Sequence, residues 1–472
     1  MSLIVRDKNF YKTVLAIAVP IALQNMVTSA VGMLDTIMLG QLGEVAMSAS
    51  SLANQVGFIF MMINFGLTGG AGVLTSQYWG RGDADSIRKV MSLTYRISMS
   101  IALIFAIGAT FFPEMLMRIF TNDEAIIYEG IRYLHYCGVI YLANAFTITT
   151  TSILRTVGTV KIALYSTLAS LLVNVFFNYG LIFGKLGMPQ MGVAGAALAT
   201  MIARLVEFAI ITVFLFRIDQ KICFQIKDFW HKVDMATVKL FMKYGAPVLC
   251  NELFWSLGNS MAAVVLGRIG AEAVAANSIC DIVFQMTSFF IWGAANAASV
   301  MTGNTIGAGE KEKARAQSKT FIVISLGLGI VASLMILGLR GFMVDFYNVA
   351  DSTKEIAYSI MNLMCFVCIF QAMGNINMFG TLRGGGDSRF VLICDVGAMW
   401  GLSVPLGFLS GLVFHWPIWV VYLCLRSSEI FTCIAGLIRL CGTRWIVDVT
   451  REKKKGSSEE KIFCVSQSGL SG

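Results

Sequence analysis

The chain has 472 residues, of which 56% are hydrophobic and only 14% are charged, and its formal net charge is +8. A soluble globular protein carries about 25% charged residues, so this composition excludes a soluble fold and predicts an integral membrane protein. None of the three His residues is paired with a nearby acid or Cys in a metal-binding or nucleophile arrangement, and no nucleotide-binding loop is present. These features argue against an enzyme and against ATP-driven pumping.

Apolar runs long enough to cross a bilayer recur along the whole chain. We expect twelve membrane-spanning helices, at 13–38, 45–78, 90–112, 131–153, 162–184, 191–216, 238–265, 272–306, 317–339, 355–381, 389–413 and 417–440.

The second half of the chain repeats the first at a distance of 227 residues. Pro20 falls on Pro247, and Leu39–Ser51 shares six of 13 positions with Leu266–Ser278. One inserted residue then changes the register to 228, which places Leu154 and Arg155 on Leu382 and Arg383. Because six spans is an even number, both halves enter the membrane the same way up. We therefore predict an all-α membrane protein with two six-helix lobes related by a parallel internal repeat.

The basic residues are distributed as this topology requires. With the N-terminus in the cytoplasm, 27 of the 36 Lys and Arg residues fall in inner segments, six in outer segments and three within spans. This is the positive-inside bias, and it places both termini in the cytoplasm of a plasma-membrane protein. The charge thus indicates contact with anionic lipid, not with nucleic acid. We expect lobes at 1–217 and 238–443, a cytoplasmic linker at 218–237, and a charged cytoplasmic tail at 444–472 that is disordered by its end.

Ionisable residues within spans cost about 2.5–3.5 kcal/mol each at the bilayer centre, so most have a function. Six acids qualify, namely Asp35, Glu207, Glu252, Asp281, Asp395 and Glu429. Glu207 lies three residues after Arg204 and Glu429 three after Arg426, and we interpret both as structural ion pairs within one helix. Asp281 and Asp395 are weaker candidates for a polar cleft, with a structural role equally plausible.

Asp35 and Glu252 have no basic residue within one helical turn, so we expect unpaired carboxylates that alternately hold a proton or a cation. The alternative is a simple hydrogen bond to a neighbouring helix. Asn174, Asn178 and Thr200 could complete a site around Asp35. Carboxylate, amide and hydroxyl oxygens suit sodium, and equally suit a hydrogen-bonded Asp that takes up a proton.

Several segments resemble the multidrug and toxic compound extrusion (MATE) family. They are Pro20–Gln24, Val31–Gly43, Asn174–Thr200, Pro247–Trp255 and Thr381–Asp387. The resemblance implies two lobes around a cleft and export of organic, often cationic, compounds in exchange for sodium ions or protons. It also implies that Asp35 and Glu252 are the family's acids of the first and seventh spans.

The chain departs from the family pattern at two places. Asn178 stands where many relatives carry Asp, and the tenth span offers Gln371, Asn375 and Asn377 where one branch carries an Asp. Sodium and proton coupling therefore both stay open.

We predict a secondary active antiporter that acts as a monomer on small organic substrates, without cofactor other than the coupling ion. The nearest alternative is a flippase for lipid-linked or polar metabolites, which needs cationic residues in its cleft; the unassigned charges within the spans are acidic. A channel is the third possibility, and the broken symmetry at the acids argues against a uniform pore.

Overall fold

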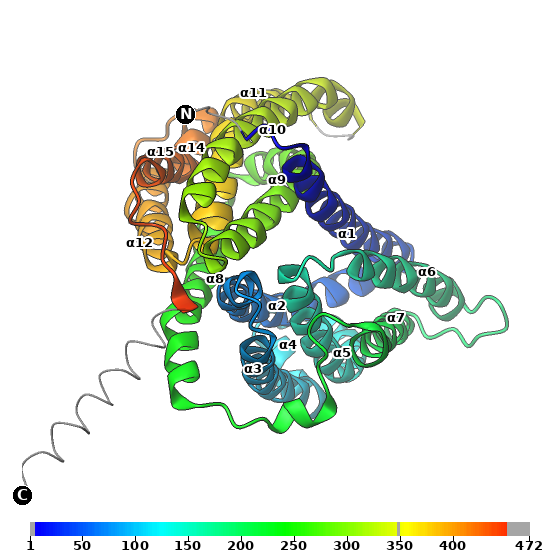
Figure 1. Cartoon of the computed structure of the whole chain (residues 1–472). Coiled ribbons are helices and arrows are strands. Elements are labelled where there is room, and N and C mark those ends of the chain that lie inside the picture. The colour runs from blue at the N-terminus through cyan, green and yellow to red at the C-terminus, as the bar shows by residue number, and fades with distance from the viewer. Residues whose placement is uncertain (1–4, 347–349, 451–472) are drawn as a thin grey trace, which may run out of the picture.

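The computed structural model describes residues 5–346 and 350–450. The first half forms a helical bundle (Figure 1). Its helices are α1 (Lys8–Gly40), α2 (Glu44–Gly80), α3 (Ala84–Phe111), the short α4 (Pro113–Arg118), α5 (Glu124–Thr156), α6 (Lys161–Phe183) and α7 (Val193–Val213). The last of these continues as the π-helical turn η1 (Phe214–Ile218). A linker with the short helix η2 (Ile226–Trp230) leads to the second half.

The second half has the same order of elements, with more interruptions. It contains α8 (Met235–Ile269), α9 (Ala271–Gly307), α10 (Lys311–Phe346), α11 (Asp351–Gly374) with η3 (Asn375–Leu382), α12 (Ser388–Ala398), η4 (Met399–Ser403), α13 (Val404–Phe408), η5 (Leu409–Val413), α14 (Ile418–Leu425) and α15 (Ser427–Cys441). The twelfth predicted span is thus broken at Arg426, between α14 and α15.

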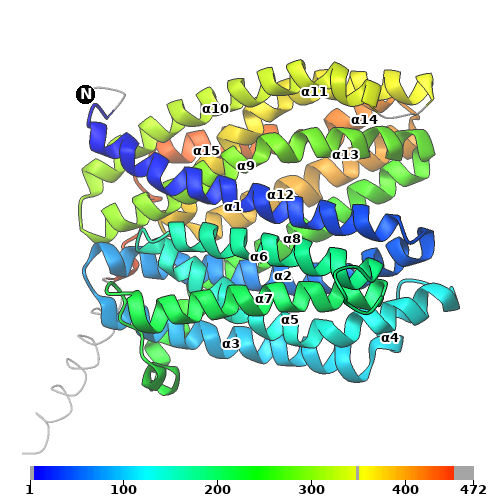
Figure 2. The same ribbon diagram turned by 90° about the vertical axis from the view of Figure 1, so that its right-hand side faces the viewer.

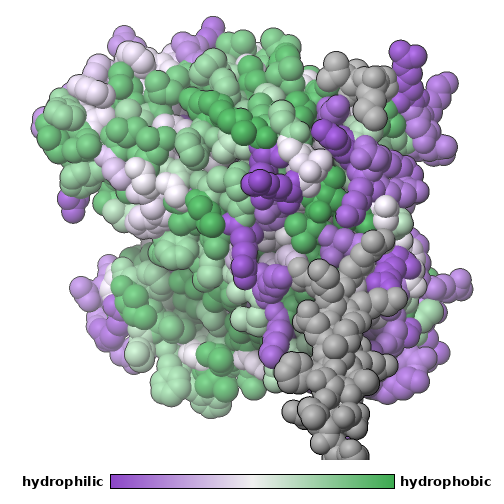
Figure 3. Space-filling view, turned by 60° about the vertical axis from the view of Figure 1, so that its left-hand side comes forward, coloured by the Kyte–Doolittle hydropathy of each residue, from purple (hydrophilic) through white to green (hydrophobic). Residues whose placement is uncertain are grey.

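Eleven helices of the described part of the chain are long and apolar enough to cross a membrane. The seventh predicted span, α8, has 35 residues but is not among them. Its central turns carry Asn251, Glu252 and Asn259, which lower its hydropathy. Many large apolar side chains are exposed on the outside of the bundle, among them Leu172 and Ile104. Figure 3 shows hydrophobic residues over most of one face, as a lipid-facing surface requires.

The helix bounds repeat as the sequence predicts. α9 begins and ends 227 residues after α2, and α8 begins 227 residues after α1. The inserted residue that changes the register to 228 also has a structural counterpart. The end of α11 continues as the wide π-helical segment η3, whereas the matching end of α5 is a regular α-helix. A π-helical turn accommodates an extra residue without breaking the helix.

The two lobes meet along the first two helices of each half. α1 packs on α9, and α2 packs on both α8 and α9. The helices run roughly side by side along the bundle (Figure 2). At the α2–α8 crossing, a Cβ on Gly70 would overlap the backbone of Gly245, so these helices approach as closely as glycine allows.

We call the end of the bundle where α1 begins and α15 finishes the inner end. There, the linker buries Ile222 and Phe224 against the first lobe. The residues after α15 are also packed: Trp445 and Val449 are fully buried. The predicted tail therefore begins with an ordered segment from 444 to 450. The prediction of disorder concerns residues 451–472, which lie outside the described part.

Candidate functional site

A cavity of about 830 Å³ lies between the two lobes. α1, α2, α5 and α7 supply its wall on one side, and α8, α9, η3 and α15 supply the other. The wall combines apolar surface from Trp255, Trp292, Phe65 and Met61 with numerous amides and hydroxyls. Such a mixture of apolar surface and a few convergent polar groups is typical of a small-molecule site.

Eight charged side chains line this cavity: Arg155, Arg204, Glu207, Glu252, Asp281, Arg383, Arg426 and Glu429. The predicted pair within α7 is confirmed, since Arg204 Nη1 lies 2.7 Å from Glu207 Oε2. The corresponding pair in the second half is not formed as predicted. Arg426 instead faces Asp281 of α9, at 3.8 Å, and lies over the rings of Phe284 and Tyr422.

The expectation of an unpaired Glu252 is wrong. Its Oε1 accepts a hydrogen bond from Arg383 Nη2 at 2.9 Å, and both side chains are largely buried. Arg383 also lies over the Phe379 ring, with its Cζ 5.0 Å from the centroid. The partner was missed because it is 131 residues away and comes from the other end of the lobe.

Asp35 and the three polar residues predicted around it lie together. Asn178 Nδ2 donates to Asp35 Oδ1 at 2.5 Å and to Asn174 Oδ1 at 3.0 Å. Asn174 Nδ2 in turn donates to Thr200 Oγ1 at 3.3 Å. Because the two Asn residues are four positions apart on α6, both lie on the face that meets α1 and α7. None of the four lines the large cavity, so this cluster is a separate site inside the first lobe.

The donor set of this cluster suits a hard cation. Asn178 is fully buried, and its Oδ1 has no hydrogen-bond partner. Together with a carboxylate and a hydroxyl, it offers only oxygen ligands, which sodium prefers. No group of three His, Cys, Asp or Glu comes together in the described part of the chain, so any cation site here depends on amide and hydroxyl oxygens. The same cluster could hold a protonated Asp35.

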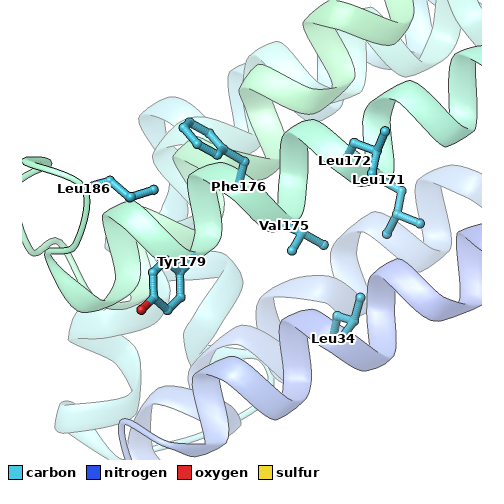
Figure 4. A pocket seen from close by; sticks show the side chains of 7 residues that line it. All are labelled: Leu34, Leu171, Leu172, Val175, Phe176, Tyr179 and Leu186. Atoms are coloured by element: carbon cyan, nitrogen blue, oxygen red, sulfur yellow. The ribbon is translucent and has the colours of Figure 1, made fainter.

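A shallow apolar recess lies next to this cluster, between α1 and α6 (Figure 4). Its walls are Leu34, Leu171, Leu172, Val175, Phe176, Tyr179 and Leu186. Leu34 directly precedes Asp35 in the sequence, and Tyr179 directly follows Asn178. The recess therefore lies on the two helices that carry Asp35, Asn174 and Asn178.

The weaker candidates are divided. Gln371 of α11 and Asn375 of η3 line the cavity, and Gln371 Oε1 is buried without a hydrogen-bond partner. Asp281 also lines it, held by Asn277 Nδ2 at 2.7 Å. Asp395 of α12 is half-buried and does not line the cavity.

Sequence reasoning missed Arg155 and Arg383 as cavity residues, because both follow apolar spans and were assigned to cytoplasmic turns. Their side chains instead point back into the cavity. Because these arginines line the cavity, the absence of cationic side chains no longer counts as an argument against a flippase. The signal that could have found them is the repeat itself, since it matches these two arginines to each other.

Comparison with known proteins agrees with this architecture. Residues 20–180 and 247–409 match the MatE family. The chain is 25% identical to "Probable multidrug resistance protein NorM" of Thermotoga maritima, over 94% of this chain and 95% of that one. It is 23% identical to "Multidrug resistance protein MdtK" of Yersinia enterocolitica, over 85% of this chain and 88% of that one.

Solved structures share the fold. A multidrug resistance MATE family transporter in an outward-facing conformation superposes with a TM-score of 0.82 at 17% identity, covering 92% of this chain and 96% of that one. A MOP superfamily transporter from Pyrococcus furiosus gives 0.81 at 18% identity, again over 92% and 96%. The family match extends over both lobes and over most of the predicted spans. This chain is therefore a multi-pass membrane transporter, not an enzyme, and belongs to the MatE family.

Proposed function

We propose that the protein is a secondary active antiporter that exports organic, multidrug-type compounds, many of them cationic, in exchange for sodium ions or protons. Relatives named as multidrug resistance proteins support the substrate class. The observation that carries the coupling is the Asp35 cluster, an oxygen-lined site with an unpartnered amide oxygen, separate from the large cavity.

The two sites share helix α7, which offers a route for coupling. Thr200 contacts the Asp35 cluster, and Arg204, one turn later, lines the cavity. An ion can drive a conformational change only through different affinities for the two states. We infer that loading of Asp35 shifts α1 and α7 and so changes the cavity by alternating access. The protein acts as a monomer in the plasma membrane, with both termini in the cytoplasm and without ATP.

The test is transport in proteoliposomes with sodium and proton gradients imposed separately. We expect wild-type protein to move a cationic dye with one of these gradients. Asp35→Asn removes the titratable carboxylate and is expected to lower gradient-driven transport to background, while the purified protein still elutes as a folded monomer.

The matched control is Asp345→Asn, which makes the same change on an exposed residue of α10 and is expected to keep the wild-type rate. Wild-type rates in Asp35→Asn, or transport indifferent to both gradients, would refute the coupling proposal. A rate that follows only the pH gradient assigns protons as the coupling ion.

A further inference from the structure

The central cavity is lined by equal numbers of positive and negative side chains, but not every charge has an opposite charge next to it. Four arginines and four acids line it, and three pairs lie within 4.0 Å: Arg204 with Glu207, Arg383 with Glu252, and Arg426 with Asp281. Two groups remain, Arg155 on the first lobe and Glu429 on the second. Neither has an ion-pair partner among the residues that the structure describes.

Arg155 is held only by neutral oxygens. Its Nη1 donates to Asn296 Oδ1 at 3.0 Å and its Nη2 to Gln24 Oε1 at 3.5 Å. Gln24 Nε2 donates a hydrogen bond to Thr167 Oγ1, which donates in turn to Glu207 Oε1. That carboxylate, however, already forms an ion pair with Arg204. A guanidinium withdrawn from bulk water without a counter-charge is costly, so a residue of this kind is expected to meet an anion at some stage of its function.

The internal repeat shows which partner is missing from the first lobe. Arg155 corresponds to Arg383, and Asn25 of α1 corresponds to Glu252 of α8. The second lobe therefore has an arginine neutralised by a carboxylate, and the first lobe has the same arginine with an amide where the carboxylate would be. Asn25 lines the cavity as Glu252 does. The same scaffold thus leaves one of its two arginines charged towards the cavity.

We propose that Arg155 binds an anionic oxygen group, such as a carboxylate or sulfonate, on the transported compound. The planar guanidinium suits such groups because it can donate two parallel hydrogen bonds. The aromatic wall is placed to receive an apolar body, since Trp292 stacks on Phe379 with centroids 6.0 Å apart. This inference rests on the proposed transport function but names a substrate class that the cation sites do not predict.

The test is equilibrium binding to purified protein, without any ion gradient, so that it is independent of coupling. The probes are rhodamine 19, which carries a free carboxylate, and rhodamine 6G, its ethyl ester. We expect wild-type protein to bind the free acid more tightly than the ester, by roughly ten- to a hundred-fold, as a charge-assisted hydrogen bond provides. Fluorescence polarisation gives both dissociation constants.

Two variants remove this preference in different ways. Asn296→Asp places a carboxylate at the position that now accepts from Arg155 at 3.0 Å, with no change in side-chain shape. It neutralises the arginine and is expected to abolish the preference for the acid while ester binding changes less than threefold. Arg155→Gln removes the charge directly and is expected to give the same loss. Use of both keeps the test decisive if one variant does not fold.

The matched control is Asn122→Asp, the same substitution at an exposed residue that does not line the cavity. It is expected to keep the acid-to-ester ratio close to wild type. Equal binding of acid and ester by wild-type protein would overturn the proposal, and so would an equal effect of Asn122→Asp and Asn296→Asp.

If the Asp35 experiment fails while the acid preference is found, the cavity assignment stands and the coupling proposal falls. The opposite result leaves a cation-coupled exporter whose Arg155 has only a structural role. The two proposals therefore fail separately.

Discussion

The contact between Glu252 and Arg383 changes the role that can be assigned to this buried acid. The carboxylate of Glu252 would be an ion-binding group if it were unpaired, yet Arg383 Nη2 lies 2.9 Å away. The guanidinium is not fully satisfied by this bond, because its buried Nε has no hydrogen-bond partner. The two side chains are 20% and 12% exposed, so each depends on the other for neutralisation. The pair ties α8 to the end of η3 on the cavity wall.

We therefore predict that Glu252→Gln destabilises the second lobe, because it leaves Arg383 charged and buried. A loss of about 1–3 kcal/mol is expected for a partly buried pair with one partner removed. Arg383→Gln should have a similar effect. The double variant should recover much of the loss, since no uncompensated charge remains. Thermal denaturation of all four proteins in detergent measures the coupling; additive effects would show that the ion pair contributes nothing.

For single residues, the sequence was informative where the spacing along one helix decides which side chains share a face. Asn174 and Asn178, four residues apart, were predicted to face one site with Asp35, and the hydrogen bonds confirm that they lie together. It was uninformative where a partner comes from another helix. Arg383 lies far from Glu252 in sequence, and nothing in the local pattern of α8 indicates it.

Among the helices, the interruptions of the second half carry most of the new information. Hydropathy predicts the spans well but cannot show where a helix widens or breaks. The repeat does show it in one case, since a register change from 227 to 228 requires an extra residue somewhere before Leu382. The structure places π-helical turns there, over Asn375–Leu382, at the cavity wall. The gap between η5 and α14 falls between the eleventh and twelfth predicted spans, whereas the break at Arg426 left no comparable trace in the sequence.

The π-helical segment makes a prediction about deletions. Removing Thr381 from η3 should convert the wide turn into a regular α-helix like the end of α5, with the residues on either side keeping their orientation. We expect this variant to insert, to fold and to elute as the wild type does. Deletion of Phe366, in the regular part of α11, rotates all following residues by about 100° and should prevent folding.

Size-exclusion chromatography and thermal denaturation in detergent distinguish the two deletions. An equal loss of folded protein in both would show that η3 is not an inserted turn. The expected difference is large, because only the second deletion moves the buried face of the helix out of the core.

For the molecule as a whole, the two lobes close against each other at the inner end through matched contacts. Gln77 Nε2 donates to the carbonyl of Gly384 at 3.4 Å, and Asn304, with its amide turned to suit its acceptors, donates to the carbonyl of Thr156 at 3.3 Å. These are the same contact in the two halves of the repeat. The segment after α15 adds to the closure, since Gln77 also donates to Val447 O and accepts from Val449 N.

The two helices that cross at this closure leave no space between their backbones. A Cβ on Gly80 would overlap the carbonyl of Asn304, and one on Gly307 would overlap the carbonyl of Gln77. The parallel repeat was predicted from the sequence, but the direction in which the cavity is closed could not be. Closure is a difference of packing between two states of the same chain, and a sequence pattern common to both states does not indicate which one is adopted.

This closure predicts how the lobes respond to a wedge. Ser76 lies at the crossing and is 1% exposed. In a background without the eleven native Cys, Ser76→Cys should react slowly with a maleimide. Adding Gly80→Leu forces α2 away from α9 and is expected to raise the labelling rate at least tenfold, because the side chain overlaps the backbone of Asn304. Gln77→Ala, which removes hydrogen bonds without a clash, should raise it less.

The control is Gly327→Leu, the same substitution on α10 at a position with open space around it. It should leave the labelling of Ser76→Cys unchanged. Equal labelling in the two Leu variants would contradict a closure that depends on this crossing. If the closure does open during transport, the coupling ion should also raise the labelling rate of Ser76→Cys in the Cys-free background without a further substitution. Asp35→Asn should abolish that response while leaving the effect of Gly80→Leu intact. This last comparison separates a lobe contact that opens under control of the Asp35 site from one that merely yields to force.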